Sequence, residues 1–512
     1  MLRSWRLLSV ALLSFASGLP LGLVWIAIPT WMAMLGVDIK VVGLFTLAQA
    51  PWTFKVLWAP LMDRYRPPWL GRKRGYILLS QALLLALGLW LAVESGRPDP
   101  ITIGLLTLLI AFASATQDIA YDAYTVEVLR REEQGPAVGA KVATYRAAMW
   151  ISGRLTITAA AIFGWPLVNA ATALLYLPSA LVTWLAPEPE SPPPPPATLR
   201  GALWEPFLGL LAKHRALEIL AFVVLYKLSD QLTQALLGPF LIQKGYNALD
   251  VGVAAGTVSL FTIVFGTFAG GVLVQARGLG PALWISGLLQ LFSNLGYALV
   301  AQAAVNRPLM YAAQGFEYLC SGLGNGAFGV LLLRLTQRRF SATQYALLSS
   351  LFSLPRVVAG PPAGLLADAL GWRDFFVFTL VTGVPGLVML GRFVPWGVRE
   401  PEFEVAPPAP GAPLRTPQLL GRGAVAFVLA AAASLATLAA VGEIKSYRAG
   451  RGFDLEAGLA SLLRPRGLAD WTGLAGVLSV ALVAAVGTAA AAAARRRPPL
   501  PESAAPSGRN IE

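Results

Sequence analysis

The stretch Ala59–Arg74 reads APLMDRYRPPWLGRKR and joins two long apolar segments. It carries five cations, which are Arg64, Arg66, Arg72, Lys73 and Arg74. A short loop rich in Lys and Arg between two membrane helices is the pattern of the cytoplasmic side. The stretch therefore predicts a membrane helix before it, another after it, and a cytoplasmic loop between them.

The composition of the whole chain favours a membrane protein. Of 512 residues, 56% are hydrophobic and only 13% are charged, with a mean hydropathy of +0.62, whereas soluble domains carry about 25% charged residues. Apolar windows of about 20 residues, enough to cross a ~30 Å hydrocarbon layer, recur along the chain. The net charge of +13 lies largely in short loops, so topology explains it and we exclude nucleic-acid binding.

We expect an all-α polytopic fold with 14 transmembrane helices. The expected spans are 7–34, 40–62, 75–93, 101–128, 138–163, 165–186, 217–242, 250–275, 281–304, 308–333, 343–370, 374–396, 423–441 and 471–494. The loop charges and the even number of spans place both termini in the cytoplasm. The expected location is the bacterial inner membrane.

Pro-rich segments divide the chain. We expect two six-helix bundles at 1–187 and 217–396, a stiff cytoplasmic linker at 188–216 and a second linker at 397–421. Two additional helices at 422–494 and a disordered tail at 495–512 complete the expected organisation.

A faint repeat supports two related halves. The first half carries Arg130-Arg131 and Gly164-Trp165, and the second carries Arg338-Arg339 and Gly371-Trp372, at an offset of about 207 residues. Weak internal symmetry of this kind is expected of transporters built from two six-helix repeats.

Ionisable residues occur in some spans and not in others. A charge at the centre of a membrane helix costs roughly 2.5 kcal/mol or more, so each one requires a reason. Spans 3, 6, 9 and 12 contain no mid-membrane charge; the charged positions are Lys55, Asp118, Asp122, Arg146, Arg154, Lys227, Asp230, Glu317 and Arg356. This layout resembles the major facilitator fold, in which helices 3, 6, 9 and 12 face lipid and the others line a central cavity.

Spacing within the spans groups these charges. Asp118 and Asp122 share one helix face, and Lys227 can pair with Asp230, three residues further on. Five cations and four anions make the expected cavity nearly neutral, so protonation of a carboxylate makes it positive and suited to an anionic cargo. The alternative, which concerns Arg154 and the Lys227–Asp230 pair most, is that buried ion pairs only hold helices together.

Two sets of motifs extend the resemblance. Asp63, Arg64, Gly71, Arg72 and Arg74 resemble the conformational latch of the major facilitator signature loop; the matching second-half loop, Gln275–Gly278, lacks the acid. Longer strings resemble the AmpG-type muropeptide permease family: GLP at 18–20, FK at 54–55, WAPLMDRY at 58–65, SATQD at 114–118, YR at 145–146, LYKL at 225–228 and FSATQ at 340–344. Two extra C-terminal helices are also a feature of that family. The chain departs from the family pattern at Pro355 and Pro361-Pro362, which are expected to alter the bend of span 11.

The resemblance implies a secondary active transporter and no enzyme. It implies import of anhydromuropeptides, GlcNAc-anhydroMurNAc with or without peptide, from periplasm to cytoplasm by proton symport. The role would be peptidoglycan recycling, which in some bacteria feeds β-lactamase induction. The expected partners are the glycopeptide, protons and the lipid bilayer, with no cofactor beyond the proton gradient, and we expect a monomer. Alternating access would occur by rocking of the halves about a midplane site.

Roles for single residues follow as hypotheses. The only histidine, His214, lies in the central linker, so proton coupling falls to carboxylates: Asp118 and Asp122 first, then Asp230 and Glu317. Cargo carboxylates would be attracted by Lys55, Arg146, Lys227 and Arg356, and sugar would bind Gln117, Tyr121, Tyr145 and Tyr226. The alternatives are a transporter of another organic anion or a drug, a transporter-like sensor, and a membrane enzyme, against which the single histidine and the short loops argue.

Overall fold

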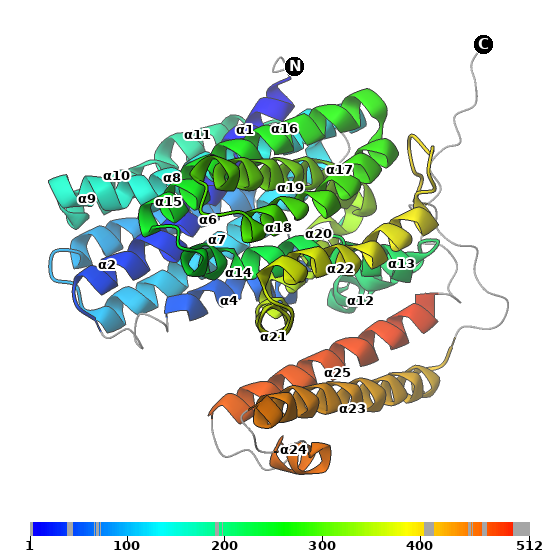
Figure 1. Cartoon of the computed structure of the whole chain (residues 1–512). Coiled ribbons are helices and arrows are strands. Elements are labelled where there is room, and N and C mark those ends of the chain that lie inside the picture. The colour runs from blue at the N-terminus through cyan, green and yellow to red at the C-terminus, as the bar shows by residue number, and fades with distance from the viewer. Residues whose placement is uncertain are drawn as a thin grey trace. The chain divides into compact units, whose positions relative to one another are not determined.

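The structure, a computed structural model, describes residues 4–37, 45–65, 67, 71, 73–189, 194–196, 198–403, 414–448, 452, 454–462 and 468–494. Across these ranges the secondary structure is helical (Figure 1). The chain forms two compact units: unit 1 comprises Met1–Pro206 and Leu217–Phe403, and unit 2 comprises Phe207–Ala216 and Glu404–Glu512.

Unit 1 contains two sets of helices, here called the first and second halves. The first half contains α1 Trp5–Gly22, η1 Leu23–Ala27, α2 Ile28–Met34, η2 Phe45–Gln49, α4 Ala50–Phe54, η3 Lys55–Leu57, α5 Ala59–Arg64, α6 Arg74–Glu94, α7 Pro100–Val128, η4 Arg131–Glu133, α8 Gln134–Trp150, η5 Ile151–Leu155, α9 Thr156–Phe163, α10 Trp165–Leu174 and α11 Tyr176–Leu185.

The second half contains α13 Ala216–Leu225, α14 Leu228–Lys244, α15 Ala248–Val253, η6 Ala254–Val258, α16 Ser259–Arg277, α17 Leu279–Ser293, α18 Leu295–Gln302, α19 Arg307–Leu335, η7 Arg338–Phe340, α20 Ser341–Val358, α21 Gly360–Leu370 and α22 Trp372–Phe393. The central linker itself contains a helix, α12 Leu199–Leu211.

Unit 2 contains the two additional helices. They are α23 Thr416–Arg448 and α25 Leu468–Ala494, which pack against each other, with the short α24 Leu455–Leu462 between them in sequence. The expected disordered tail, 495–512, lies outside the described residues.

Among the described residues, ten helices are long and apolar enough to cross a membrane, so 14 uninterrupted spans are not observed. The four expected spans that fail this criterion are spans 2, 5, 7 and 11, and their sequences explain why. Proline or polar residues break three of them, at α4–η3–α5, at the step from α13 to α14, and at the step from α20 to α21. Span 5 is continuous, but Lys141, Arg146 and Arg154 make it less apolar. These spans also hold most of the intramembrane charges.

The two halves repeat the same local structure. Gly164 and Gly371 have φ values of +80° and +77°, in the left-handed region that glycine tolerates, and each is followed at once by a helix that begins with tryptophan. The 3₁₀ turns η4 and η7 also occupy matching positions in the two halves. The repeat expected from the sequence is therefore a structural one.

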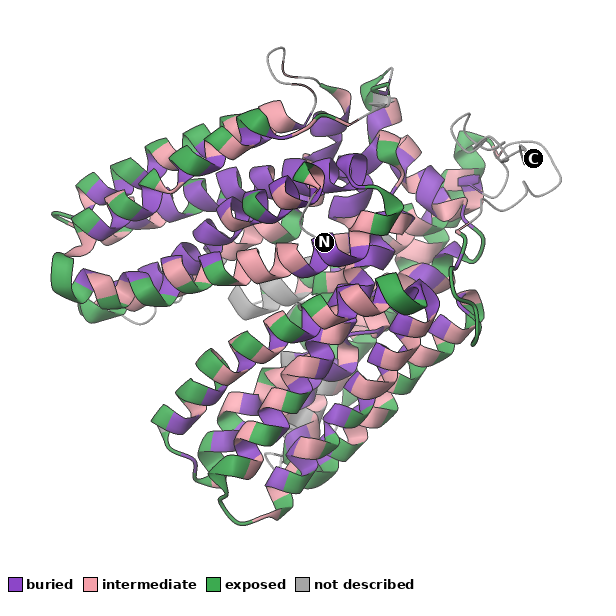
Figure 2. Ribbon diagram, turned by 90° about the horizontal axis from the view of Figure 1, so that it is seen from above, coloured by how far each residue is buried: buried purple, intermediate pink, exposed green. Residues whose placement is uncertain are grey.

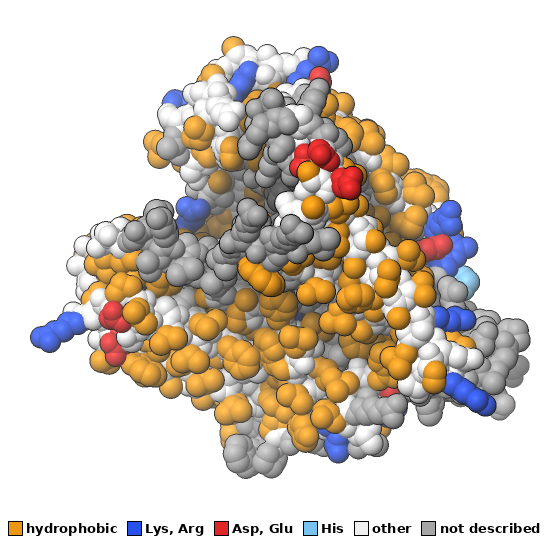
Figure 3. All heavy atoms as spheres, turned by 90° about the horizontal axis from the view of Figure 1, so that it is seen from below, with side chains coloured by type: hydrophobic (Ala, Val, Ile, Leu, Met, Phe, Trp, Pro, Cys, Tyr) orange, Lys and Arg blue, Asp and Glu red, His pale blue; other side chains and the backbone are white. Residues whose placement is uncertain are grey.

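Each half has its own apolar core. One cluster surrounds Trp31 and another surrounds Phe376. Figure 2 shows buried residues concentrated in the middle of the view, with exposed residues frequent on the helices at its margins. Hydrophobic side chains are frequent on the surface shown in Figure 3, as expected of a membrane protein.

The halves touch closely at one end of the helix pair α8 and α16. A Cβ built on Gly135 would lie 2.4 Å from the carbonyl oxygen of Gly271, and one built on Gly271 would lie 2.2 Å from that of Gly135. Only glycine allows the two backbones to approach this closely.

Candidate functional site

A cavity of about 700 Å³ lies between the two halves, within the size range of small-molecule sites. Its lining comes from α1, η1, η3, α7, α8, α14, α16, α19 and α20. Among the described residues that line it, none comes from the helices of spans 3, 6, 9 or 12. This division between cavity-lining and peripheral helices agrees with the one expected from the positions of the charges. We call this space the central cavity.

Asp122 is held between two lysines in the first half. Its Oδ2 lies 3.3 Å from Lys55 Nζ and its Oδ1 lies 2.6 Å from Lys141 Nζ. Lys141 also stands over the rings of Tyr121 and Tyr345, at 4.7 and 5.4 Å from their centroids. Because Tyr345 belongs to the second half, Lys141 lies where the halves meet. Lys141 lies within α8 and inside the expected span 138–163.

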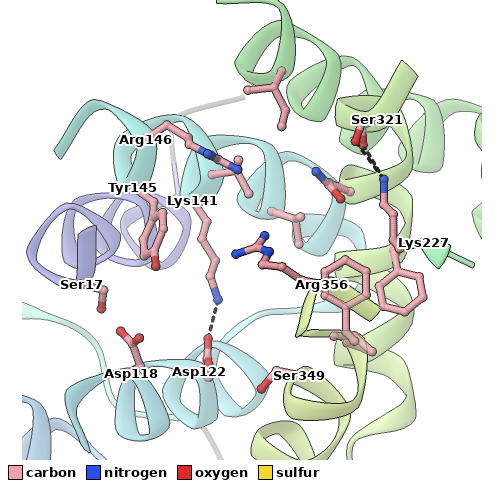
Figure 4. A pocket seen from close by; sticks show the side chains of 18 of the residues that line it. Ser17, Asp118, Asp122, Lys141, Tyr145, Arg146, Lys227, Ser321, Ser349 and Arg356 are labelled. Atoms are coloured by element: carbon pink, nitrogen blue, oxygen red, sulfur yellow. Dashed lines mark hydrogen bonds and ion pairs between the residues drawn. The ribbon is translucent and has the colours of Figure 1, made fainter. Parts of the chain in front are cut away.

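Asp118 lies one turn before Asp122 and has no such partners. Its side chain lines the cavity beside Ser17 (Figure 4), it is only 8% exposed, and its Oδ1 has no hydrogen-bond partner. No ion pair of Asp118 occurs among the described residues. Gln117 donates from Nε2 to Ser17 Oγ at 3.3 Å and does not line the cavity.

Lys227 and Asp230 form the expected ion pair, at 3.0 Å. Lys227 Nζ also donates to Gln290 Oε1 at 2.9 Å and to Ser321 Oγ at 3.1 Å, and the lysine reaches the cavity. Asp230 does not line the cavity. Tyr226 is turned away from it as well, with its hydroxyl 3.0 Å from Ser286 Oγ.

Glu317 is fully buried behind the cavity wall. Its Oε1 accepts from Gln234 Nε2 at 3.2 Å, and its Oε2 has no hydrogen-bond partner. Gln234 lines the cavity whereas Glu317 does not. Only the amide side chain of Gln234 therefore joins Glu317 to the cavity lining among the described residues.

Arg146 and Arg356 come from opposite halves, and both guanidinium groups point into the central cavity (Figure 4). Within the described part of the chain, neither guanidinium makes a hydrogen bond or an ion pair. Tyr145, next to Arg146, also lines the cavity.

The cavity is more positive than the sequence suggested. The described lining holds five cations, Lys55, Lys141, Arg146, Lys227 and Arg356, against two carboxylates, Asp118 and Asp122. The expectation of near neutrality is corrected because Lys141 joins the lining while Asp230 and Glu317 do not.

Asp63, from the signature loop, contacts the other half of the molecule. Its fully buried carboxylate accepts from the backbone N–H groups of Ala342 and Thr343, at 3.1 and 2.8 Å, and from the Thr343 hydroxyl at 2.8 Å. These groups form the N-terminus of α20, where a carboxylate satisfies free N–H groups and the helix dipole. Lys73 Nζ lies 2.7 Å from Asp63 Oδ1, and Glu127 of α7 accepts from the Ser341 hydroxyl. We call this contact between the halves the latch cluster.

Other residues of the expected latch act inside the first half. Arg74 Nε donates to Glu188 Oε1 at 2.7 Å, after the end of α11. Gly71 has a φ of +72°, in the left-handed region that favours glycine, and it lies against the same carboxylate. Arg64 lies over the ring of Tyr65, 5.6 Å from its centroid. Arg72 lies outside the described residues.

Sequence reasoning missed several cavity residues. They are Ser17, Trp25, Lys141, Gln231, Gln234, Tyr318, Asn325 and Tyr345. For Lys141 a signal existed, because it lies four residues before Tyr145 and so on the same face of one helix. The uncharged residues carry no such signal, since polar and aromatic side chains occur on every span.

Known proteins are similar to this chain in sequence. A sequence model described as Major Facilitator Superfamily matches residues 10–359. The chain is 41% identical to the anhydromuropeptide permease of Escherichia coli K12 over 385 residues, 74% of this chain and 78% of that one. It is 28% identical to putative transporter AmpG 4 of Rickettsia conorii over 398 residues, 76% of this chain and 96% of that one.

A solved structure agrees with these matches. The human organic anion transporter MFSD10 aligns with a TM-score of 0.58 over 75% of this chain and 99% of that chain, at 13% identity, which supports the fold alone. Together the matches define a multi-pass membrane transporter of a small molecule rather than an enzyme. The chain belongs to the Major Facilitator Superfamily, and within it to the AmpG-type permease family that its motifs indicated.

Proposed function

We propose that the protein imports anhydromuropeptides from periplasm to cytoplasm by proton symport with alternating access, for cell-wall recycling. The orientation rests on the loop charges, which place both termini in the cytoplasm of an inner-membrane protein. The cargo is that named for the E. coli relative.

The main support for the proposal is the position of Arg146 and Arg356. They belong to opposite halves, they face one cavity, and neither has a carboxylate partner among the described residues. A guanidinium binds a carboxylate through two parallel N–H···O bonds, so the pair suits an acidic cargo. Because the two arginines lie on different halves, a bound carboxylate would join the halves, as a rocking mechanism requires.

The remaining lining suits the sugar of such a cargo. Trp25, Tyr121, Tyr145 and Tyr345 offer aromatic faces, and Gln231 offers an amide. Flat apolar faces with a few polar groups are typical of small-molecule sites. Gln117 and Tyr226, expected to bind sugar, do not line the cavity and fit positioning roles better.

We assign proton coupling to Asp118 first and to Glu317 second. Asp122 and Asp230 are held by lysines at 2.6–3.3 Å, which stabilise their charged forms. Asp118 and Glu317 have no ion pair among the described residues, and each leaves one buried oxygen without a partner. A buried carboxylate without a cation is costly when charged, so these two can exchange a proton during the cycle.

Transport by purified protein in vesicles tests the proposal. Labelled anhydromuropeptide should accumulate under an inward proton gradient, and a protonophore should abolish the accumulation. Asp118→Asn should reduce gradient-driven accumulation at least about tenfold but leave exchange of cargo across the membrane within about threefold, because exchange needs no net proton movement.

Asp122→Asn is the matched control, one turn further along the same helix. It removes an ion-paired carboxylate, so accumulation and exchange should fall together. Uptake that ignores the protonophore would rule out symport, and an Asp118→Asn variant with full accumulation would remove Asp118 from coupling. Transport of a drug or of an unrelated organic anion, without transport of anhydromuropeptide, would show that the proposed cargo is wrong.

A further inference from the structure

A second, smaller space adjoins the central cavity between the two halves. Its volume is about 180 Å³, and it shares Arg146, Met149, Ile263 and Tyr318 with the central cavity. Its other lining residues are Ile26, Trp150, Arg154, Ala255, Gly256, Ser259 and Leu260. We call it the side chamber. It lies along the pair α8–η5 and η6–α16, roughly five helical turns from the Gly135–Gly271 contact.

The helices around the side chamber are distorted in the same way. The described π-helical segments are η1, η5 and η6, and each contributes a residue to the lining: Ile26 from η1, Arg154 from η5, and Gly256 from η6. π-turns are rare and are frequently found at functional sites.

The π-turn in η5 explains how two arginines reach one chamber. On a regular α-helix, residues eight positions apart point about 80° away from each other. A π-turn accommodates one extra residue, which brings Arg154 back toward the face of Arg146. Both side chains then line the side chamber.

The glycine opposite makes room for the second arginine. A Cβ built on Gly256 would lie 3.2 Å from Arg154 Nη1 and 3.3 Å from its Cζ. The guanidinium of Arg154, in the first half, therefore lies against the backbone of Gly256, in the second half. Among the described residues its side chain makes no ion pair, and no carboxylate belongs to the chamber's lining.

We propose that the side chamber binds the carboxylates of the peptide stem of the cargo, with Arg154 as a specificity-determining residue. The proposal rests on the proposed function, which supplies the cargo. The volume of 180 Å³ is below the usual range for a whole ligand, so the chamber holds one arm of a molecule whose body occupies the central cavity. Arg146 lines both spaces and contacts the junction between sugar and stem.

Binding and transport of two cargoes test this subsite. Full-length wild type and Arg154→Gln are compared with labelled disaccharide that carries a tripeptide stem and with the peptide-free disaccharide. Calorimetry on the purified protein measures affinity, and vesicles with zwitterionic lipid alone or with added anionic lipid measure uptake. The variant should lower affinity for the stem-bearing cargo about tenfold and for the peptide-free cargo less than twofold, because one charge-assisted contact is lost.

Two further variants sharpen the test. Arg154→Lys keeps the charge without the planar fork, so its loss of stem affinity should be intermediate. Arg97→Gln removes an exposed cation after α6 without touching either cavity and should change neither affinity.

The outcomes separate the two proposals. If wild type binds and accumulates both cargoes but Arg154→Gln affects them equally or not at all, the side-chamber subsite is wrong while the function stands. An equal effect seen only with anionic lipid would identify the chamber's ligand as a lipid headgroup and also overturn the subsite. If wild type binds neither cargo, the proposed function fails with it.

Discussion

The two lysines that flank Asp122 show how single residues organise the central cavity. Lys141 reaches Asp122 from α8 and Lys55 reaches it from η3, so one carboxylate joins three elements. Each ion is only partly exposed, with 9–16% of its side chain accessible. Removing one partner of such a pair leaves a poorly solvated charge, which is costly.

This arrangement predicts strong coupling between Lys141 and Asp122. Lys141→Met should lower the free energy of unfolding by about 2 kcal/mol, and Asp122→Asn by a similar amount. The double variant should lose less than the sum, with a coupling of about 1 kcal/mol or more, because the unpaired charge is absent. Thermal unfolding in detergent measures all three proteins. Strictly additive losses would contradict a direct pair.

The sequence predicted the charged residues of the central cavity better than the uncharged ones. Asp118, Asp122, Arg146 and Arg356 were recognisable because a charge in an apolar span requires an explanation. All four line the cavity. Which carboxylate has a cation beside it could not be predicted, since that depends on side chains from helices far apart in the sequence.

The latch cluster attaches helix α20 of the second half to the first half. Its N-terminus receives Asp63 from the first half, and the next hydroxyl contact, from Ser341, goes to Glu127 of the same half. The carboxylate faces the positive end of the helix dipole. The latch cluster therefore stabilises the conformation described, in which the halves touch at this end.

Weakening the latch cluster should shift the conformational equilibrium. Asp63→Asn removes a charge worth about 1 kcal/mol at a helix N-terminus, so a state with these ends apart should become about fivefold more populated. Spin labels at Tyr65 and Arg338, one on each half, report the separation by pulsed electron resonance. The single cysteine, Cys320, is buried and can be replaced first.

Asp99 supplies the matched control for the latch. It caps α7 within the first half through Thr102, and the backbone hydrogen bond from Thr102 lowers the pKa of Asp99, so it is also charged at neutral pH. Asp99→Asn should leave the distance distribution unchanged. A latch variant whose distribution equals that of the control would show that Asp63 does not set the equilibrium.

Broken helices were the least predictable elements. Length and apolarity predicted most spans well, but spans 2, 5, 7 and 11 do not form single helices that are long and apolar enough, and spans 1 and 8 contain π-turns. Pro355 lies inside α20, and a new helix begins at Gly360, so the bend expected in span 11 takes the form of a break. The π-turns η1, η5 and η6 contain no proline and so have no comparable sequence signal.

In the whole molecule, the second-half loop that matches the signature loop also contacts a carboxylate, but the carboxylate comes from another part of the chain. The acid absent from Gln275–Gly278 is supplied by Glu400, after α22, which accepts from the backbone N–H of Leu279 at 3.3 Å. Glu400 also pairs with Arg131 of the first half, at 3.4 Å, and with Arg334 of the second. The end of unit 1 thus contributes to the contact between the halves.

Unit 2 should be dispensable for transport. The R. conorii relative is matched over 96% of its length by 76% of this chain, so about a quarter of this chain has no counterpart there. Deletion of 404–512 should leave vesicle uptake within about twofold of wild type, because every residue of the central cavity and side chamber lies in unit 1. Loss of uptake with normal folding, checked by thermal unfolding, would give the two extra helices a transport role.

Arg146 and Arg356, which have no carboxylate partner among the described residues, affect how the affinity of this protein should be measured. Two guanidinium groups that face one space attract small anions from the medium, and an arriving cargo must displace them. Apparent affinity will therefore depend on the choice of buffer salt. Affinities measured in concentrated chloride or citrate will be lower than affinities measured at low salt.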